Sequence, residues 1–148
     1  MDWRLRGDNT PFHRGHPPGK DARMIISDHL GGILAVTGVI TALPVVQFLA
    51  PRPALKLLYK LELTEEGGAF FARHWGMCCF AIGAMLVYAA GHAEVRAPIM
   101  LGALVEKVAL VAMIFSGWNK PHVKGLRLAG VFDTICSLIY GTWLLGLA

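Results

Sequence analysis

Residues 95–118 read VRAPIMLGALVEKVALVAMIFSGW, an apolar run with Glu106 and Lys107 near its middle. At about 1.5 Å per helical residue, the run is long enough to cross a hydrocarbon core of about 30 Å. Lipid cannot satisfy bare backbone N–H and C=O groups, so a spanning segment of this kind must be a helix. The stretch therefore predicts a transmembrane helix that contains two charged side chains.

Three further apolar runs occupy residues 25–50, 69–91 and 126–148. Hydrophobic residues make up 55% of the chain and charged residues 16%, whereas soluble proteins average roughly 25% charged residues. Because the last two links are short, sequential helices are expected to run antiparallel. We therefore predict an all-α polytopic membrane protein, whose residues 24–148 form a four-helix transmembrane bundle.

Residues 1–23 carry many charges together with Pro and Gly, which is typical of a flexible basic tail. They contain no apolar core of a signal peptide. The net charge of +4 comes from basic residues that flank apolar runs, a pattern that favours lipid headgroups over nucleic acid. We predict an integral membrane protein of the bacterial inner (plasma) membrane. The basic residues divide equally between the two sides of the membrane, and the dense basic tail before the first helix favours a cytoplasmic N-terminus.

The link after the first run, residues 51–68, predicts a short amphipathic helix. Pro51 and Pro53 end the preceding helix. One face of the new helix carries Leu57, Leu58 and Leu61, and another carries Lys56 and Lys60. This pattern favours a helix lying in the membrane interface, and a stiff loop is the alternative. Thr64-Glu65-Glu66 would then cap the next helix.

Small residues recur at seven-residue spacing on the first two predicted helices. They are Gly31 and Gly38 on the first helix, and Gly76, Gly83 and Ala90 on the second. Stripes of small residues let membrane helices approach closely. We therefore expect these two helices to pack against each other along this stripe.

The ionisable residues inside the runs are Asp28, His29, Arg73, His74, Glu106, Lys107 and Asp133. An unpaired charge at the centre of a span costs about 2.5–3.5 kcal/mol, so partners are expected. Glu106 and Lys107 are adjacent and therefore do not face each other on a helix.

Antiparallel threading brings several of these groups to similar depths. We predict that Lys107 pairs with Asp133, and that Glu106 pairs with Arg73 or His74. Two cations and two anions would make a neutral interhelical network. Gln47 belongs to the same half of the bundle.

This network has three interpretations. It fixes helix register, it lines a cavity for a lipophilic ligand such as a lipid, isoprenoid or quinone, or it forms a proton or ion path. The first two fit a non-catalytic accessory or ligand-binding subunit of a larger membrane complex. The alternative function is a small membrane enzyme with His74, Glu106 and Asp133 as acid–base groups. Whether the chain is an enzyme stays open, and the sequence requires no cofactor.

A slim bundle of this size favours membrane protein partners or self-association, in addition to lipid. Cys78, Cys79 and Cys136 lie inside the runs without a C-x-x-C spacing and are interpreted as packing residues. His13 and His16 provide two ligands, too few for a closed metal site, so we predict no metal. Haem is not expected, because His29 and His74 enter from opposite ends of the bundle.

The segment FARHWGMCCFAIGAMLVYAAGHAEVRAPIMLGALVEKVAL, residues 71–110, carries a family resemblance. The matching positions are Ala72-Arg73-His74-Trp75-Gly76, Gly83, Arg96 and Glu106-Lys107. The segment resembles the second and third helices of small DoxX-like four-helix membrane proteins, whose activity is largely unassigned. The resemblance implies the four-helix architecture and the Arg, His, Glu and Lys pattern, and it implies no mechanism. Membrane glutathione transferases share the helix number, but their Arg-Asn-Glu motif is not matched.

Overall fold

The computed structural model describes residues 20–147, with side-chain surroundings from residue 26 onwards. Within this part the chain is helical and contains no strand, which confirms the all-α prediction. The elements are α1 (Lys20–Ala42), η1 (Leu43–Val45), α2 (Val46–Leu49), α3 (Pro51–Tyr59), α4 (Glu66–Gly91), η2 (Ala93–Val95), α5 (Arg96–Ser116), η3 (Pro121–Leu126) and α6 (Arg127–Leu144).

Three helical segments are long and apolar enough to cross a membrane: Ile26–Leu49, Glu66–Gly91 and Ala93–Ser116. They indicate a membrane protein. The fourth predicted run forms α6, which is 18 residues long, contains Arg127 and Asp133, and is not one of these three segments.

The predicted tail lies almost entirely outside the described residues. Residues 1–19, with His13 and His16, are not described, and α1 begins at Lys20. The last residues of the predicted tail therefore belong to the first helix.

Pro44 divides the first apolar run, which the sequence predicted as one continuous helix. The α-helix ends at Ala42, a 3-10 turn covers Leu43–Val45, and α2 follows. Proline has no N–H to donate to the preceding turn, and its ring clashes with that turn, so the helix must change course. The carbonyl of Pro44 lies against Gly76 of α4, where a Cβ would be only 2.6 Å away.

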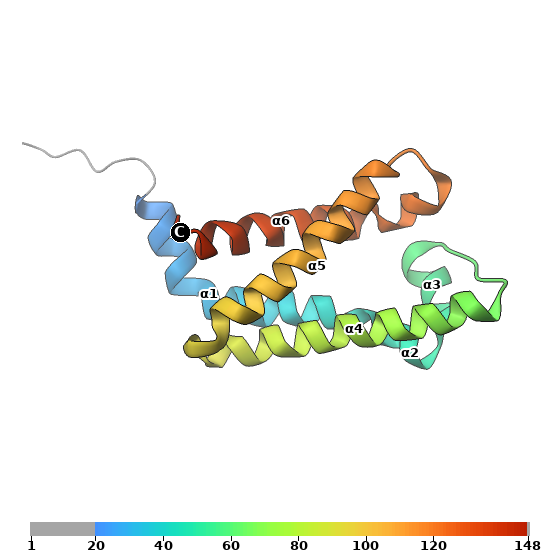
Figure 1. The fold of residues 1–148 in the computed structure, drawn as a ribbon, viewed down its shortest axis with the longest axis horizontal. Helices are drawn as coiled ribbons and strands as arrows, with labels where there is room; N and C mark the ends of the chain where they lie inside the picture. Colours follow the sequence, from blue (N-terminus) through green and yellow to red (C-terminus); the bar gives the residue numbers. More distant parts are fainter. Residues whose placement is uncertain (1–19, 148) are drawn as a thin grey trace, which may run out of the picture.

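The helices pack as two antiparallel pairs, α1 with α4 and α5 with α6 (Figure 1). In Figure 1, α5 crosses diagonally between α6 and the α1–α4 pair, while α2 and α3 lie near the start of α4. A core of buried residues joins the pairs: Leu30, Leu34, Leu86, Ala89, Met100, Ala103, Cys136 and Tyr140.

The small-residue stripe forms the α1–α4 contact, as predicted. A Cβ on Gly83 would lie 2.5 Å from the carbonyl oxygen of Gly38 and 2.7 Å from the backbone nitrogen of Ala42. A Cβ on Gly31 would lie 3.0 Å from the carbonyl oxygen of Ala90. No side chain fits between the two backbones at Gly83, so glycine at this position determines how closely the helices approach.

The link after the first run does contain the predicted short helix, α3. It ends one residue before Lys60, which adopts a left-handed φ of 58°, so Leu61 lies outside the helix. Ion pairs join Arg52 to Glu66 at 2.5 Å and Lys56 to Glu62 at 2.8 Å.

The predicted cap of α4 is not formed. Its N-cap residue is Glu65, and no side chain there makes a capping hydrogen bond. Arg52 instead binds the Glu66 carboxylate at this end of α4, which fixes α3 to the start of the second span.

Gly83→Ala should weaken the fold, because its methyl group would overlap the backbone of α1. Overpacking of this kind costs about 1–3 kcal/mol. Gly102→Ala on α5 is the matched control, since nothing lies within 4 Å of a Cβ there. Thermal unfolding in detergent should show a lower midpoint for Gly83→Ala and no loss for Gly102→Ala. Equal midpoints would contradict the close α1–α4 contact.

Candidate functional site

Lys107 and Asp133 form a buried ion pair between α5 and α6. The Lys107 Nζ lies 2.5 Å from Oδ1 of Asp133 and donates a second hydrogen bond to the hydroxyl of Thr41 on α1 at 3.1 Å. Lys107 is 1% exposed and Asp133 5%, so water cannot solvate the charges. The pair that antiparallel threading predicted is therefore present, and it joins three helices.

A second buried contact joins α1 to α6. The Thr37 and Tyr140 hydroxyls lie 2.5 Å apart. Thr37 and Thr41 are four residues apart on α1, and Asp133 and Tyr140 are seven apart on α6, so each set shares one helix face. The sequence analysis missed both threonines and the tyrosine, although this periodicity is visible in the sequence.

The predicted partners of Glu106 lie elsewhere. Arg73 is exposed on α4 and donates to the backbone carbonyl of Phe48 at 2.7 Å. His74 is also exposed, with its Nε2 3.6 Å from Sγ of Cys78. The prediction that Glu106 pairs with Arg73 or His74 is wrong, because both side chains are exposed and contact other groups.

Glu106 consequently forms no ion pair among the described residues, and the nearby Lys107 is paired with Asp133. Its Oε2 atom is buried and makes no hydrogen bond within the described part of the chain. The predicted neutral network is thus replaced by one cation and two carboxyl groups. An uncompensated buried carboxyl group is unfavourable and needs either a proton or a partner that the fold itself does not supply.

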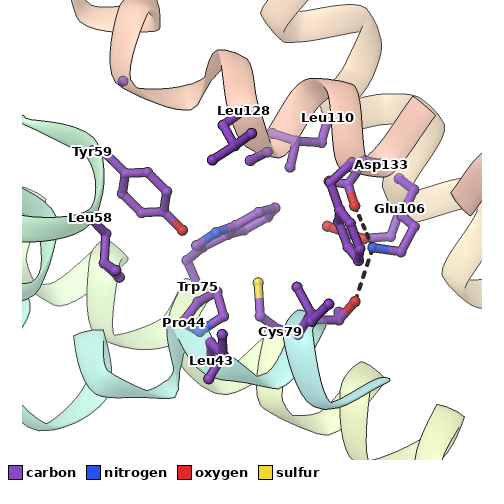
Figure 2. Close-up of a pocket in the computed structure, with 16 residues that line it drawn as sticks. Leu43, Pro44, Leu58, Tyr59, Trp75, Cys79, Glu106, Leu110, Leu128 and Asp133 are labelled. Atoms are coloured by element: carbon purple, nitrogen blue, oxygen red, sulfur yellow. Dashed lines mark hydrogen bonds and ion pairs between the residues drawn. The ribbon is translucent and has the colours of Figure 1, made fainter. Parts of the chain in front are cut away.

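Glu106 lines a partly open cavity of about 460 Å³ bordered by α1, η1, α3, α4, α5, η3 and α6 (Figure 2). The walls are mainly apolar and aromatic. They consist of Ile40, Thr41, Leu43, Pro44, Leu58, Tyr59, Trp75, Cys79, Glu106, Lys107, Leu110, Gly125, Leu128, Ala129, Phe132 and Asp133. Three of the predicted polar residues, Glu106, Lys107 and Asp133, therefore meet at one cavity.

Tyr59 provides a second polar group on the cavity wall. Figure 2 shows its hydroxyl directed towards the space beside Trp75, on the opposite side from Glu106 and Asp133. Burial raises the pKa of Tyr59 above its usual value of 10, and the nearby Gln47 side chain acts in the opposite direction. The hydroxyl is therefore protonated at neutral pH.

Gln47, which was predicted to belong to the polar network, does not line the cavity. It is 1% exposed, and its Nε2 is buried without a hydrogen-bond partner within residues 26–147. Its side chain lies near Tyr59.

Two backbone features create the space. The Pro44 turn bends the first helix beside the cavity, so that Leu43 and Pro44 both face it. Gly125 of η3 touches the backbone of Tyr59, where a Cβ would overlap the Tyr59 carbonyl group. The end of α3 is thereby held against the start of α6 and closes one side of the cavity.

Of the other candidate residues, Cys79 lines the cavity, while Asp28, His29, Cys78 and Cys136 do not. Asp28 and His29 are exposed on α1. Cys79 and Cys136 are buried without disulfides, and Cys78 is partly exposed. Within the described residues, no cluster of three or more His, Cys, Asp or Glu has the arrangement of a metal site.

Comparison with protein-family models, with curated proteins and with solved structures finds no match to this chain. The interpretation of the site therefore depends on its own geometry and chemistry.

The buried ion pair should show strong coupling in a double-mutant cycle. Lys107→Met leaves a buried carboxylate without its cation, and Asp133→Leu leaves a buried ammonium, so each change should cost about 3–5 kcal/mol. The double variant removes both charges and should recover much of that loss. Unfolding free energies in detergent measure the coupling, with the exposed Lys56→Met as control. Losses that simply add would show that the pair is not coupled.

Proposed function

We propose that this chain is a helical membrane protein that binds a lipophilic ligand in the Glu106 cavity. The supporting observation is a cavity of about 460 Å³ in which an apolar wall surrounds a carboxyl oxygen without a hydrogen-bond partner. Ligand pockets are typically about 300–1,000 Å³ and mainly apolar, with a few polar groups that orient the ligand. The cavity has this composition.

The positions of the polar groups support binding of an elongated or bulky apolar molecule with a polar end. Glu106, with the Lys107–Asp133 pair, lies at one side of the cavity, and the Tyr59 hydroxyl lies at the other (Figure 2). Between them are Trp75 and Leu128. An apolar ligand body would contact these walls, and its polar end would reach Glu106.

The membrane setting of this site is also part of the proposal. We propose that α6 crosses the membrane as a fourth span, because it packs antiparallel to α5 and carries the buried partner of Lys107. At 18 residues it is about 27 Å long, close to the thickness of a hydrocarbon core. The short helix α3 would lie at the interface, and the chain would be an inner-membrane protein with a cytoplasmic N-terminus.

Acid–base catalysis is less well supported than binding. Of the three candidate catalytic residues, His74 is exposed away from the cavity and Asp133 is held by Lys107. Only Glu106 has a carboxyl oxygen at the cavity without a partner among the described residues. One such group can bind a ligand without performing chemistry on it.

The proposal predicts a ligand that copurifies with the protein. Ala129 lines the cavity, and Ala129→Trp would fill part of it with an indole ring. Ala109 is an exposed alanine on α5 outside the cavity, so Ala109→Trp is the matched control. Native mass spectrometry after gentle detergent extraction should find a bound lipid-soluble molecule in wild type and in Ala109→Trp. Ala129→Trp should lose most of it.

Retention of the same molecule by Ala129→Trp would place it on the outer surface and refute the cavity as the binding site. The same extraction tests the predicted accessory role. A protein partner recovered at fixed stoichiometry would support a subunit of a larger complex, and recovery of the chain alone would oppose it. The DoxX-like resemblance adds no mechanism to this proposal.

A further inference from the structure

We propose that the ligand of the Glu106 cavity is a lipophilic organic cation, such as an amine or quaternary ammonium with an apolar body, and that the Glu106 carboxylate is its counter-ion. This inference rests on the proposed function and deepens it by naming the class of ligand. It follows from the charges on the cavity wall.

Among the described residues, Lys107 is the cation on the cavity wall, and it is already paired. Lys107 Nζ lies 2.5 Å from the Asp133 carboxylate, 3.1 Å from the Thr41 hydroxyl, and 5.2 Å from the centre of the Phe132 ring. An ammonium has three donors in all, and this one is 1% exposed. Lys107 and Asp133 therefore neutralise each other, and neither is available to bind a charged ligand.

When it is ionised, Glu106 gives the cavity an excess of negative charge. Its Oε2 is buried without a hydrogen-bond partner within residues 26–147. Arg73, which the sequence analysis assigned as a counter-ion, binds the Phe48 carbonyl instead and lies outside the cavity lining. A bound cation would compensate this carboxylate in a place where solvent screening is weak, so the attraction would be strong.

The aromatic walls also favour a cation. Trp75, Tyr59 and Phe132 line the same cavity as Glu106, and Phe132 already has Lys107 over its ring. The faces of aromatic rings attract organic cations through their quadrupoles, and this attraction is greater when water is excluded. Among the described residues, an anionic ligand would meet two carboxyl groups and no available cation, while a neutral ligand would leave an ionised Glu106 uncompensated.

The test measures binding of tetraphenylphosphonium and tetraphenylborate, two ions of the same shape and opposite charge. Full-length protein in lipid nanodiscs of uncharged net composition is titrated by equilibrium dialysis. Wild type should bind the cation at least tenfold more tightly than does Glu106→Gln, which removes the charge at almost constant size. Tetraphenylborate should bind no more weakly to Glu106→Gln than to wild type. Glu106→Asp should keep the preference for the cation.

The pH dependence gives a second readout. Protonation removes the negative charge of Glu106, so cation binding should weaken as pH falls, and this dependence should be reduced in Glu106→Gln. The other titratable groups around the cavity are Tyr59, Cys79, Lys107 and Asp133. The double variant Asp133→Asn with Lys107→Met removes the buried ion pair and shows whether the pair contributes to this dependence.

Equal binding of the cation to wild type and Glu106→Gln would overturn the inference. The inference would also be overturned if wild type bound both ions with equal affinity and neither Glu106→Asp nor Glu106→Gln changed those affinities. If neither ion binds while Ala129→Trp still abolishes a copurifying neutral lipid, the cation assignment fails and the proposed binding function stands. If the copurifying molecule is also indifferent to Ala129→Trp, both proposals fail.

Discussion

The ion pair between Lys107 and Asp133 is the interaction on which the rest of the site depends. It is buried, it joins α5 to α6, and through Thr41 it reaches α1. Two charges without access to water hold each other in place, because separating them would leave each one unsolvated. The pair also decides the chemistry of its neighbour. Because Lys107 is already paired, the Glu106 carboxyl group has no cationic partner of its own among the described residues.

The space beside this pair is created by backbone geometry. Gly38 and Gly83 bring α1 and α4 into direct backbone contact, which fixes one wall firmly. Beyond that contact, Pro44 interrupts the α-helix with a 3-10 turn, and its carbonyl lies against Gly76 of α4. Gly125 brings the end of α3 against η3 and closes the opposite side. A tight helix pair, a bend and a folded-back short helix together enclose an apolar cavity.

Part of this site was predictable from the chain alone. Antiparallel threading places Lys107 and Asp133 at similar depth, and a buried charge requires a partner, so their pairing followed from simple constraints. The glycine contact followed from seven-residue spacing. The pairing of Glu106 was wrong because depth does not specify direction: Arg73 lies at a suitable level on α4 but projects away, towards the Phe48 carbonyl. Tyr59 was missed because α3 reaches the cavity only after the chain folds back.

The sequence by itself determined that the protein is helical, that long apolar segments are fit to cross a membrane, and that small residues let two of them touch. These properties depend on local composition and periodicity, which are properties of the chain. Only the tertiary structure decided which side chains face each other across the bundle. It directed Arg73 and His74 outwards, brought Tyr59 to Glu106's cavity, and left one carboxyl group without a partner among the described residues. Helix rotation decides these contacts, and packing of all the helices together sets that rotation.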